Sequence, residues 1–319
     1  MSYLENNQCI MKKVFLFVLA VAAFAQSVFA FEDKVVMVRS EKMNKDVPVT
    51  VILPDSYAES VKLPVLYLLN GWSGNHRHWP ERGKVGCLAD RYDVILVMPD
   101  TGYDSWYFDS KVTPEYQYET FVTKELIGYV DSNFKTIPDR SGRAVTGLSM
   151  GGHGALFLSF RHQDLFGSAG SMSGGVDIRP FPEKWGIAKR LGSYEDNPQA
   201  WEENTVINLT HLLKPESLNL IIDCGTGDFF YEVNCNLHKK LLDEGIPHDF
   251  ISRPGVHIGI TGQIQSSIRL SSSMIILFVR VIESDQIFIS LAVIDSKADF
   301  FRQGYCIYRF YSYLCIVIN

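Results

Sequence analysis

The chain has 319 residues, of which 46% are hydrophobic and 21% are charged, and its formal net charge is −6. This composition is typical of a globular protein and excludes a largely disordered chain. Thirty Lys and Arg against 36 Asp and Glu leave no basic excess, so we expect no nucleic-acid partner. No apolar run reaches the roughly 18–20 residues of a bilayer span, so we also expect no stable membrane insertion.

The first thirty residues have the pattern of an export signal. Met11-Lys12-Lys13 supplies a positive start, residues 14–25 form an uninterrupted apolar run, and Val28-Phe29-Ala30 offers small residues before a cleavage point. Positive start, short apolar core and small-residue exit together are typical of a secretory signal peptide. We therefore expect residues 1–30 to be an N-terminal extension and signal peptide. The mature chain is expected to begin near Phe31 and to be secreted or periplasmic.

From Phe31 to His257, short β-rich runs alternate with helical stretches, which predicts an α/β fold. The continuous apolar runs 64–69 and 94–98 indicate strands covered on both faces, and hence a mostly parallel central sheet with helices on both sides. With no internal repeat and no linker, residues 31–257 are expected to form one domain. Strands are predicted over 34–39, 47–53, 64–69, 94–98, 143–148, 168–172, 218–223 and 248–252, and helices over 119–134, 150–160 and 231–244. The polar stretch 179–215 reads as an insertion above the sheet.

The segment from Gly147 to Gly152 carries the main chemical signal. It reads Gly-Leu-Ser-Met-Gly-Gly, which matches the G-x-S-x-G pattern, with a predicted strand before it and a predicted helix after it. Small residues on either side of Ser149 allow a sharp, strained turn. The turn places the hydroxyl at a helix N-terminus, where free amides favour a developing oxyanion. Ser149 is therefore the predicted nucleophile, and the Met150 amide is one predicted oxyanion-hole donor.

A second oxyanion donor is expected in the loop after the predicted strand 64–69. This loop reads Asn70-Gly71-Trp72-Ser73-Gly74. We expect the Trp72 amide to be the donor, because Gly71 allows the chain a tight path at this point.

A nucleophilic serine needs a base, and the base needs an acid to orient it; the usual chain order of this arrangement is serine, acid, histidine. His257 lies just beyond the last predicted strand, at the same sheet edge as Ser149, and is the predicted base. Two acids are candidates: Asp223 ends a strand, and Asp228 lies five residues later in a glycine-rich loop. The loop favours Asp228, which has room to turn toward the base, and leaves Asp223 to satisfy loop N–H groups.

At these residues the chain resembles the esterase D family of α/β-hydrolases, which includes S-formylglutathione hydrolases, feruloyl and acetyl xylan esterases and, more distantly, mycolyltransferases. The resemblance covers roughly residues 32–257 and implies an α/β-hydrolase fold. It assigns the nucleophile to Ser149, the acid to Asp228, the base to His257 and the oxyanion donors to Trp72 and Met150. One departure is Asn70, where the family commonly has His. The motifs that carry the resemblance are Tyr67–Gly71, Met98–Asp100, Ser105–Tyr107, Gly147–Ala155, Gly225–Phe229 and Arg253–His257.

The resemblance and the export signal together predict a secreted serine carboxylesterase that acts on small-molecule or polysaccharide esters, with an acetyl or feruloyl acyl group. Trp79, Trp106 and Tyr107 are expected to bind substrate, since flat aromatic faces stack on acyl and sugar groups. No cofactor is implied, and His, Asp and Cys show no metal-ligand spacing. Two alternatives remain open: an acyltransferase of the mycolyltransferase type, and an inactive carbohydrate-binding paralogue.

The tail, residues 258–319, departs from the family pattern. It contains 13 Ile and no Trp, Pro or His in 62 residues, and it lacks the His-x-Trp-x-x-Trp segment with which such chains usually continue. One hypothesis is a frameshift just after His257, which would replace the final helix; the rival is a genuine extension. Loss of that helix would leave His257 poorly positioned, so the sequence predicts reduced stability and low or absent activity for this chain.

Overall fold

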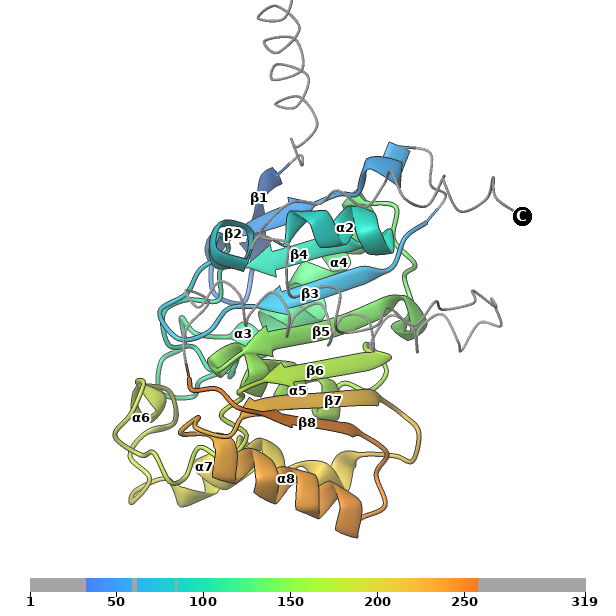
Figure 1. Ribbon diagram of the computed structural model, residues 1–319. Helices are drawn as coiled ribbons and strands as arrows, with labels where there is room; N and C mark the ends of the chain where they lie inside the picture. The colour runs from blue at the N-terminus through green and yellow to red at the C-terminus, as the bar shows by residue number, and fades with distance from the viewer. Residues whose placement is uncertain (1–32, 59–61, 84, 258–319) are drawn as a thin grey trace, which may run out of the picture.

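The computed structural model describes residues 33–58, 62–83 and 85–257 (Figure 1). The predicted signal peptide and residues 258–319 lie outside this part of the chain. Among the helices of the described residues, none is both long enough and apolar enough to cross a bilayer.

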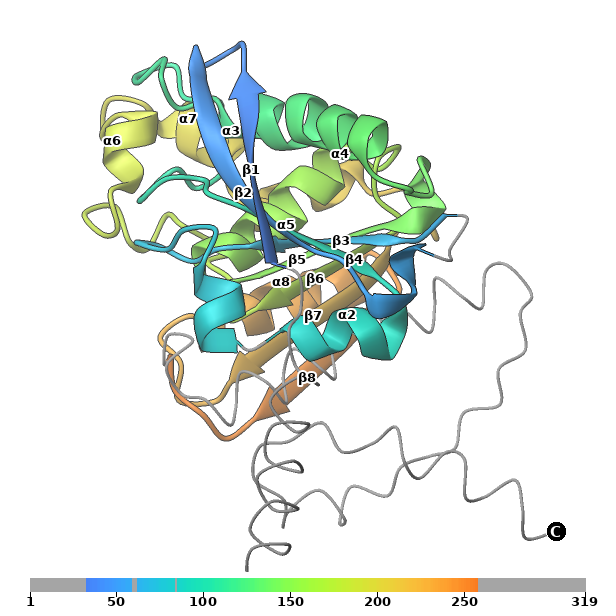
Figure 2. The same ribbon diagram turned by 90° about the horizontal axis from the view of Figure 1, so that it is seen from above.

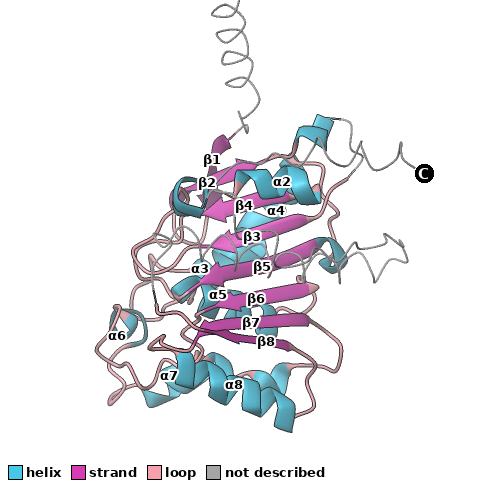
Figure 3. Ribbon diagram, in the orientation of Figure 1, coloured by secondary structure: helices cyan, strands magenta, loops and turns pink. Residues whose placement is uncertain are grey.

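Eight strands form a single sheet in the order β1-β2-β4-β3-β5-β6-β7-β8. The β1 strand pairs antiparallel with β2, and β2 pairs antiparallel with β4, whereas the remaining neighbours are parallel. The predicted mostly parallel sheet is therefore confirmed (Figure 3). The strands are β1 (Asp33–Ser40), β2 (Lys45–Ile52), β3 (Val65–Leu69), β4 (Ile95–Pro99), β5 (Arg143–Leu148), β6 (Ser168–Met172), β7 (Asn219–Gly225) and β8 (Asp249–Arg253).

Helices cover both faces of the sheet, as predicted (Figure 2). The helical segments are η1 (Asp55–Ala58), η2 (Trp79–Gly83), α2 (Gly86–Tyr92), α3 (Tyr118–Thr120), η3 (Phe121–Leu126), α4 (Ile127–Asn133), η4 (Arg140–Gly142), α5 (Met150–Arg161), α6 (Ile187–Leu191), α7 (Pro198–Glu203), η5 (Val206–Asn208), η6 (Thr210–Leu212) and α8 (Tyr231–Asp243). The segments α3, η3 and α4 follow one another without a break, and together they match the helix predicted over 119–134. The α6 and α7 helices belong to the predicted insertion, and α6 lies beyond the carboxyl ends of the strands (Figure 1).

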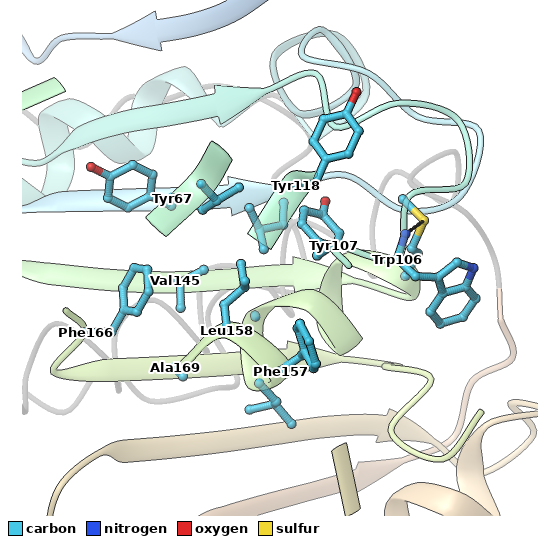
Figure 4. Packing of buried hydrophobic residues seen from close by; sticks show 14 of the residues in the cluster. Tyr67, Trp106, Tyr107, Tyr118, Val145, Phe157, Leu158, Phe166 and Ala169 are labelled. Atoms are coloured by element: carbon cyan, nitrogen blue, oxygen red, sulfur yellow. Dashed lines mark hydrogen bonds between the residues drawn. The ribbon is translucent and has the colours of Figure 1, made fainter. Parts of the chain in front are cut away.

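The apolar core consists of two clusters, one on each face of the sheet. Every residue of β3 and of β4 is buried, as expected for central strands covered on both faces. The larger cluster joins the sheet to α4, α5 and α8, and part of it is drawn in Figure 4. The smaller cluster lies under α2 and η2. Residues 150–160 of α5 are all buried, which explains why this helix is apolar on every side and rich in small residues.

The turn from β5 into α5 is so tight that it requires glycine on both sides of Ser149. A Cβ on Gly151 would overlap the carbonyl oxygen of Leu69 and would lie 2.9 Å from that of Asn70. A Cβ on Gly147 would overlap the Gly151 backbone in turn. Both obstacles are main-chain atoms, which cannot rotate away as a flexible side chain can.

A glycine-to-alanine pair tests this packing. We expect Gly151→Ala to lower the free energy of unfolding by about 2–3 kcal/mol, because it forces the first turn of α5 away from β3. Gly128→Ala is the matched control: Gly128 lies on the exposed side of α4, and a Cβ at this position would meet no atom within 4 Å beyond its own stretch of helix backbone. The control should raise the free energy of unfolding by about 0.5–1 kcal/mol through helix propensity. Urea titrations that gave both variants the same sign of change would contradict this account.

Candidate active site

Ser149 occupies a strained backbone conformation between β5 and α5. Its φ is 60° and its ψ is −117°, a combination that non-glycine residues rarely adopt. The Ser149 amide donates to the Met172 carbonyl oxygen at 2.9 Å, and the Ser149 carbonyl accepts from the His153 amide at 3.0 Å. The first of these bonds ties the turn to the end of β6, and the second begins the hydrogen bonding of α5. The turn is thus fixed at both ends, and the side chain stands at the carboxyl edge of the sheet.

The structure brings the predicted nucleophile, base and acid together, although Ser149 and His257 are 108 positions apart. The His257 Nε2 lies 3.0 Å from the Ser149 Oγ. The His257 Nδ1 lies 2.9 Å from each carboxylate oxygen of Asp228. A neutral imidazole that carries its proton on Nδ1 satisfies both contacts: it donates to Asp228 and accepts from the serine hydroxyl. This arrangement can deprotonate the Ser149 hydroxyl.

The loops that follow β7 and β8 are joined by backbone hydrogen bonds. The Thr226 amide donates to the Arg253 carbonyl at 2.9 Å, and the Gly227 amide donates to the Gly255 carbonyl at 2.8 Å. These bonds extend the pairing of β7 and β8 beyond the sheet. The acid on one loop and the histidine on the other are therefore held at a fixed separation.

The Asp223 carboxylate has a different partner from the Asp228 carboxylate. It is fully buried near the end of β7, and its carboxylate forms an ion pair with the Arg253 guanidinium at the end of β8. It thus joins the two strands that carry the loops. The geometry agrees with the choice of Asp228 as the partner of His257, and the sequence did not predict the Arg253 ion pair.

The Asp228 carboxylate is stabilised in its ionised form. Burial raises the pKa of this carboxyl group. The hydrogen bond from His257 and the charge that His257 carries when it is protonated, together with bonds from the Phe230 amide and the Ser173 hydroxyl, outweigh burial. The net result is a pKa below the ordinary value. The Phe230 amide donates to the Asp228 Oδ1 at 2.8 Å, so the carboxylate is oriented by the backbone as well. An ionised carboxylate in this position would stabilise the imidazolium that proton transfer to His257 would form.

The two predicted oxyanion donors come from two separate segments that approach Ser149. Met150 is the first residue of α5, where helix amides have no partner within the helix. In the loop after β3, a Cβ built on Gly71 would lie 3.1 Å from the Leu148 carbonyl oxygen and 3.6 Å from the Ser149 Cβ. The backbone that leads into Trp72 therefore passes directly beside the nucleophile.

The structure corrects the prediction that Trp79, Trp106 and Tyr107 bind substrate. Trp79 and Trp106 are each 1% exposed and Tyr107 is fully buried, so none of the three offers an open ring face. Trp79 belongs to the cluster on the α2 side of the sheet, and its Nε1 donates to the Leu69 carbonyl. Trp106 and Tyr107 lie in the larger cluster (Figure 4). Residue type alone suggested stacking platforms, but these rings fill the core behind the site.

Other aromatic residues lie against the site. The exposed Phe229 ring tilts over His257, with ring centroids 4.1 Å apart, and it also stacks with the Trp185 ring at 5.2 Å. Trp72 and Tyr103, both exposed, form an edge-to-face pair with centroids 4.7 Å apart. Sequence reasoning did not select Phe229 as a site residue, although its position directly after Asp228 was an available signal. No feature of the sequence pointed to Tyr103.

The frameshift hypothesis also predicted that loss of the final helix would leave His257 poorly positioned. In the described residues it is not: two hydrogen-bonded side chains and the Phe229 ring hold the imidazole. How residues 258–319 affect activity stays a prediction.

Comparisons with known proteins agree with this geometry. The model of the Esterase family, described as putative esterases, matches residues 40–257. An endo-1,4-beta-xylanase/feruloyl esterase of Xylanibacter ruminicola is 37% identical over 151 residues, which are 43% of this chain and 21% of that protein. An acetyl esterase of Caldicellulosiruptor saccharolyticus is 27% identical over 238 residues, covering 68% of this chain and 89% of that one. A solved ferulic acid esterase superposes with a TM-score of 0.66 at 28% identity, covering 79% of this chain and all of that one.

Because the family model matches more than half of the chain, the protein belongs to the Esterase family, and the resemblance to the esterase D-like α/β-hydrolases is confirmed. The chain spans less than a third of the length of the relatives that it matches at 37–39% identity.

Proposed function

We propose that this protein is a serine esterase that hydrolyses carboxylic esters through an acyl-Ser149 intermediate. The observation that carries the proposal is the hydrogen-bonded chain from Asp228 through His257 to Ser149, on a strained turn at a helix N-terminus. Membership of the Esterase family supports the same conclusion independently.

In the proposed reaction, the Ser149 Oγ attacks the ester carbonyl carbon while the His257 Nε2 accepts the hydroxyl proton. Asp228 keeps the imidazole oriented and stabilises its positive charge. The amides of Trp72 and Met150 donate to the tetrahedral oxyanion. Collapse of this intermediate breaks the ester C–O bond, and His257 returns its proton to the departing alkoxide. Water then repeats the sequence on the acyl-enzyme and releases the acid.

Three variants test the mechanism with 4-nitrophenyl acetate. Ser149→Ala should lower kcat by roughly 10⁴–10⁶-fold, because the triad acts as a unit. Asp228→Asn should lower it by roughly 10⁴-fold, because the amide favours the wrong tautomer of His257.

Asp223→Asn is the control, and it should keep kcat within about tenfold. It should lower the free energy of unfolding by about 1–3 kcal/mol, which is less than for a fully buried ion pair because Arg253 is partly exposed. If Asp223→Asn impaired turnover and Asp228→Asn did not, the assigned acid would be wrong. A wild-type chain without activity would support the inactive-paralogue alternative.

We further propose that the acyl group is aromatic and that the natural ester is on a polysaccharide. Two relatives are named for feruloyl or ferulic acid ester hydrolysis, one of them joined to a xylanase. In this chain, the Phe229 and Trp185 rings form an aromatic wall beside the base. A planar aromatic acid can pack on such a wall, whereas an acetyl group gains little from it.

The wall can be tested with two esters that share a leaving group, 4-nitrophenyl ferulate and 4-nitrophenyl acetate. We expect Phe229→Ala to lower the ferulate-to-acetate ratio of kcat/KM by about 3–10-fold, the equivalent of one aromatic contact. Tyr194→Ala is the control, because Tyr194 is another exposed aromatic residue, which packs on Trp201 in the insertion. An unchanged ratio in Phe229→Ala would remove the support for an aromatic acyl group.

Export is proposed from the sequence of residues 1–30 alone. N-terminal sequencing of the protein recovered outside the cytoplasm should give a first residue near Phe31. A mature protein that retains residues 11–30 would contradict a cleaved signal peptide.

A further inference from the structure

The loop after β3 carries the Trp72 amide that the proposed mechanism uses, and two buried side chains hold the peptide groups on either side of Gly71. These side chains belong to Asn70 and Tyr107, and both are fully buried. Sequence reasoning gave Asn70 no role beyond its backbone and assigned Tyr107 to substrate.

The Asn70 side chain holds the peptide group that contains the Trp72 amide. Its Oδ1 accepts from the Thr101 amide at 3.3 Å and from the Thr101 hydroxyl at 2.9 Å. An amide N–H can only donate, so these bonds fix which end of the carboxamide faces Thr101. The Nδ2 end is left to donate to the Gly71 carbonyl oxygen at 3.1 Å. The Gly74 amide donates to the same oxygen at 2.9 Å.

Holding that carbonyl sets the direction of the Trp72 N–H. The Gly71 carbonyl and the Trp72 amide belong to one planar peptide group, and in a trans peptide they point in opposite directions. No cis peptide occurs among the described residues. Gly71 itself has wide conformational freedom, so without external bonds this peptide group could rotate.

Tyr107 holds the preceding peptide group. Its hydroxyl donates to the Asn70 carbonyl oxygen at 2.8 Å. Its ring packs against α5 so tightly that a Cβ on Gly154 would overlap it. The Tyr107 backbone has a φ of 66°, a left-handed conformation that is unusual for a bulky residue and that the surrounding packing must maintain. The hydroxyl therefore reaches the loop from a ring that is wedged against the helix following Ser149.

We propose that Asn70 and Tyr107 are positioning residues that orient the Trp72 amide toward the oxyanion. This inference rests on the esterase function proposed above. Neither side chain touches substrate; each acts through a carbonyl oxygen of the loop. Removal of either one leaves Ser149, His257 and Asp228 in place but loosens one donor of the oxyanion hole.

Tyr107→Phe is the cleanest test, because it removes one hydroxyl and keeps the ring. Tyr67→Phe is its matched control: Tyr67 is also fully buried in β3, and its hydroxyl has no hydrogen-bond partner among the described residues. With 4-nitrophenyl acetate, we expect Tyr107→Phe to lower kcat about tenfold with KM within about twofold, a fraction of the roughly 10²–10³-fold effect of losing an oxyanion donor outright. Asn70→Ala should lower kcat about 10–100-fold, and Tyr67→Phe should change neither constant.

Inhibition by a trifluoromethyl ketone distinguishes a positioning role from a merely structural one, because a structural role would not change the inhibition constant. The ketone forms a tetrahedral adduct with the serine and places an oxyanion in the hole. Its inhibition constant should rise in each variant by the factor by which kcat/KM falls. Equal kinetics and inhibition in Tyr107→Phe and Tyr67→Phe, or a change confined to KM, would overturn the inference and leave the proposed function standing. A wild-type chain without esterase activity would overturn both.

Discussion

The strained backbone of Ser149 is the constraint on which the rest of the site depends. A φ of 60° is unfavourable for serine, and it persists because the turn is held by the Met172 carbonyl on one side and by the glycine contacts with β3 on the other. The parallel sheet makes those anchors possible, since β3, β5 and β6 end side by side at one edge. The strained turn presents the Ser149 hydroxyl at the start of α5, at the carboxyl edge of the sheet. Burial of nearly all of this helix supplies the packing that keeps the turn in place.

The same edge of the sheet explains how residues far apart in the chain meet. The β7 and β8 strands run parallel to β5, so the loops that follow them reach the same end of the molecule. Two backbone hydrogen bonds between these loops, and the Asp223–Arg253 ion pair beneath them, fix the acid and the base relative to each other. The nucleophile needs a sharp turn, whereas the acid and the base need loops with glycine and room to turn. The sequence shows both requirements.

Most of the fold could be predicted because its strands have distinct patterns. The buried runs of β3 and β4 are continuous and apolar, and β5 and β6 have the predicted bounds. Spacing, chain order and the glycine-rich loop were enough to predict Ser149, Asp228 and His257, whose side chains the structure brings within hydrogen-bond distance. They were not enough to assign the aromatic residues, because a tryptophan in a loop can face either solvent or core. Trp79 and Trp106 face the core, while Trp72 and Phe229 are exposed, and only tertiary packing decides between these outcomes. The bonds of the Asn70 side chain likewise depend on Thr101, which comes from a different strand end.

The most direct measurement is the site of covalent modification by a fluorophosphonate, read by mass spectrometry of the digested protein. This reagent reports a serine whose hydroxyl is activated by a neighbouring base. We predict a single adduct, on the peptide that contains Ser149, and loss of that adduct when His257 is replaced by Ala. Modification of a different serine, or undiminished labelling of Ser149 without His257, would contradict it.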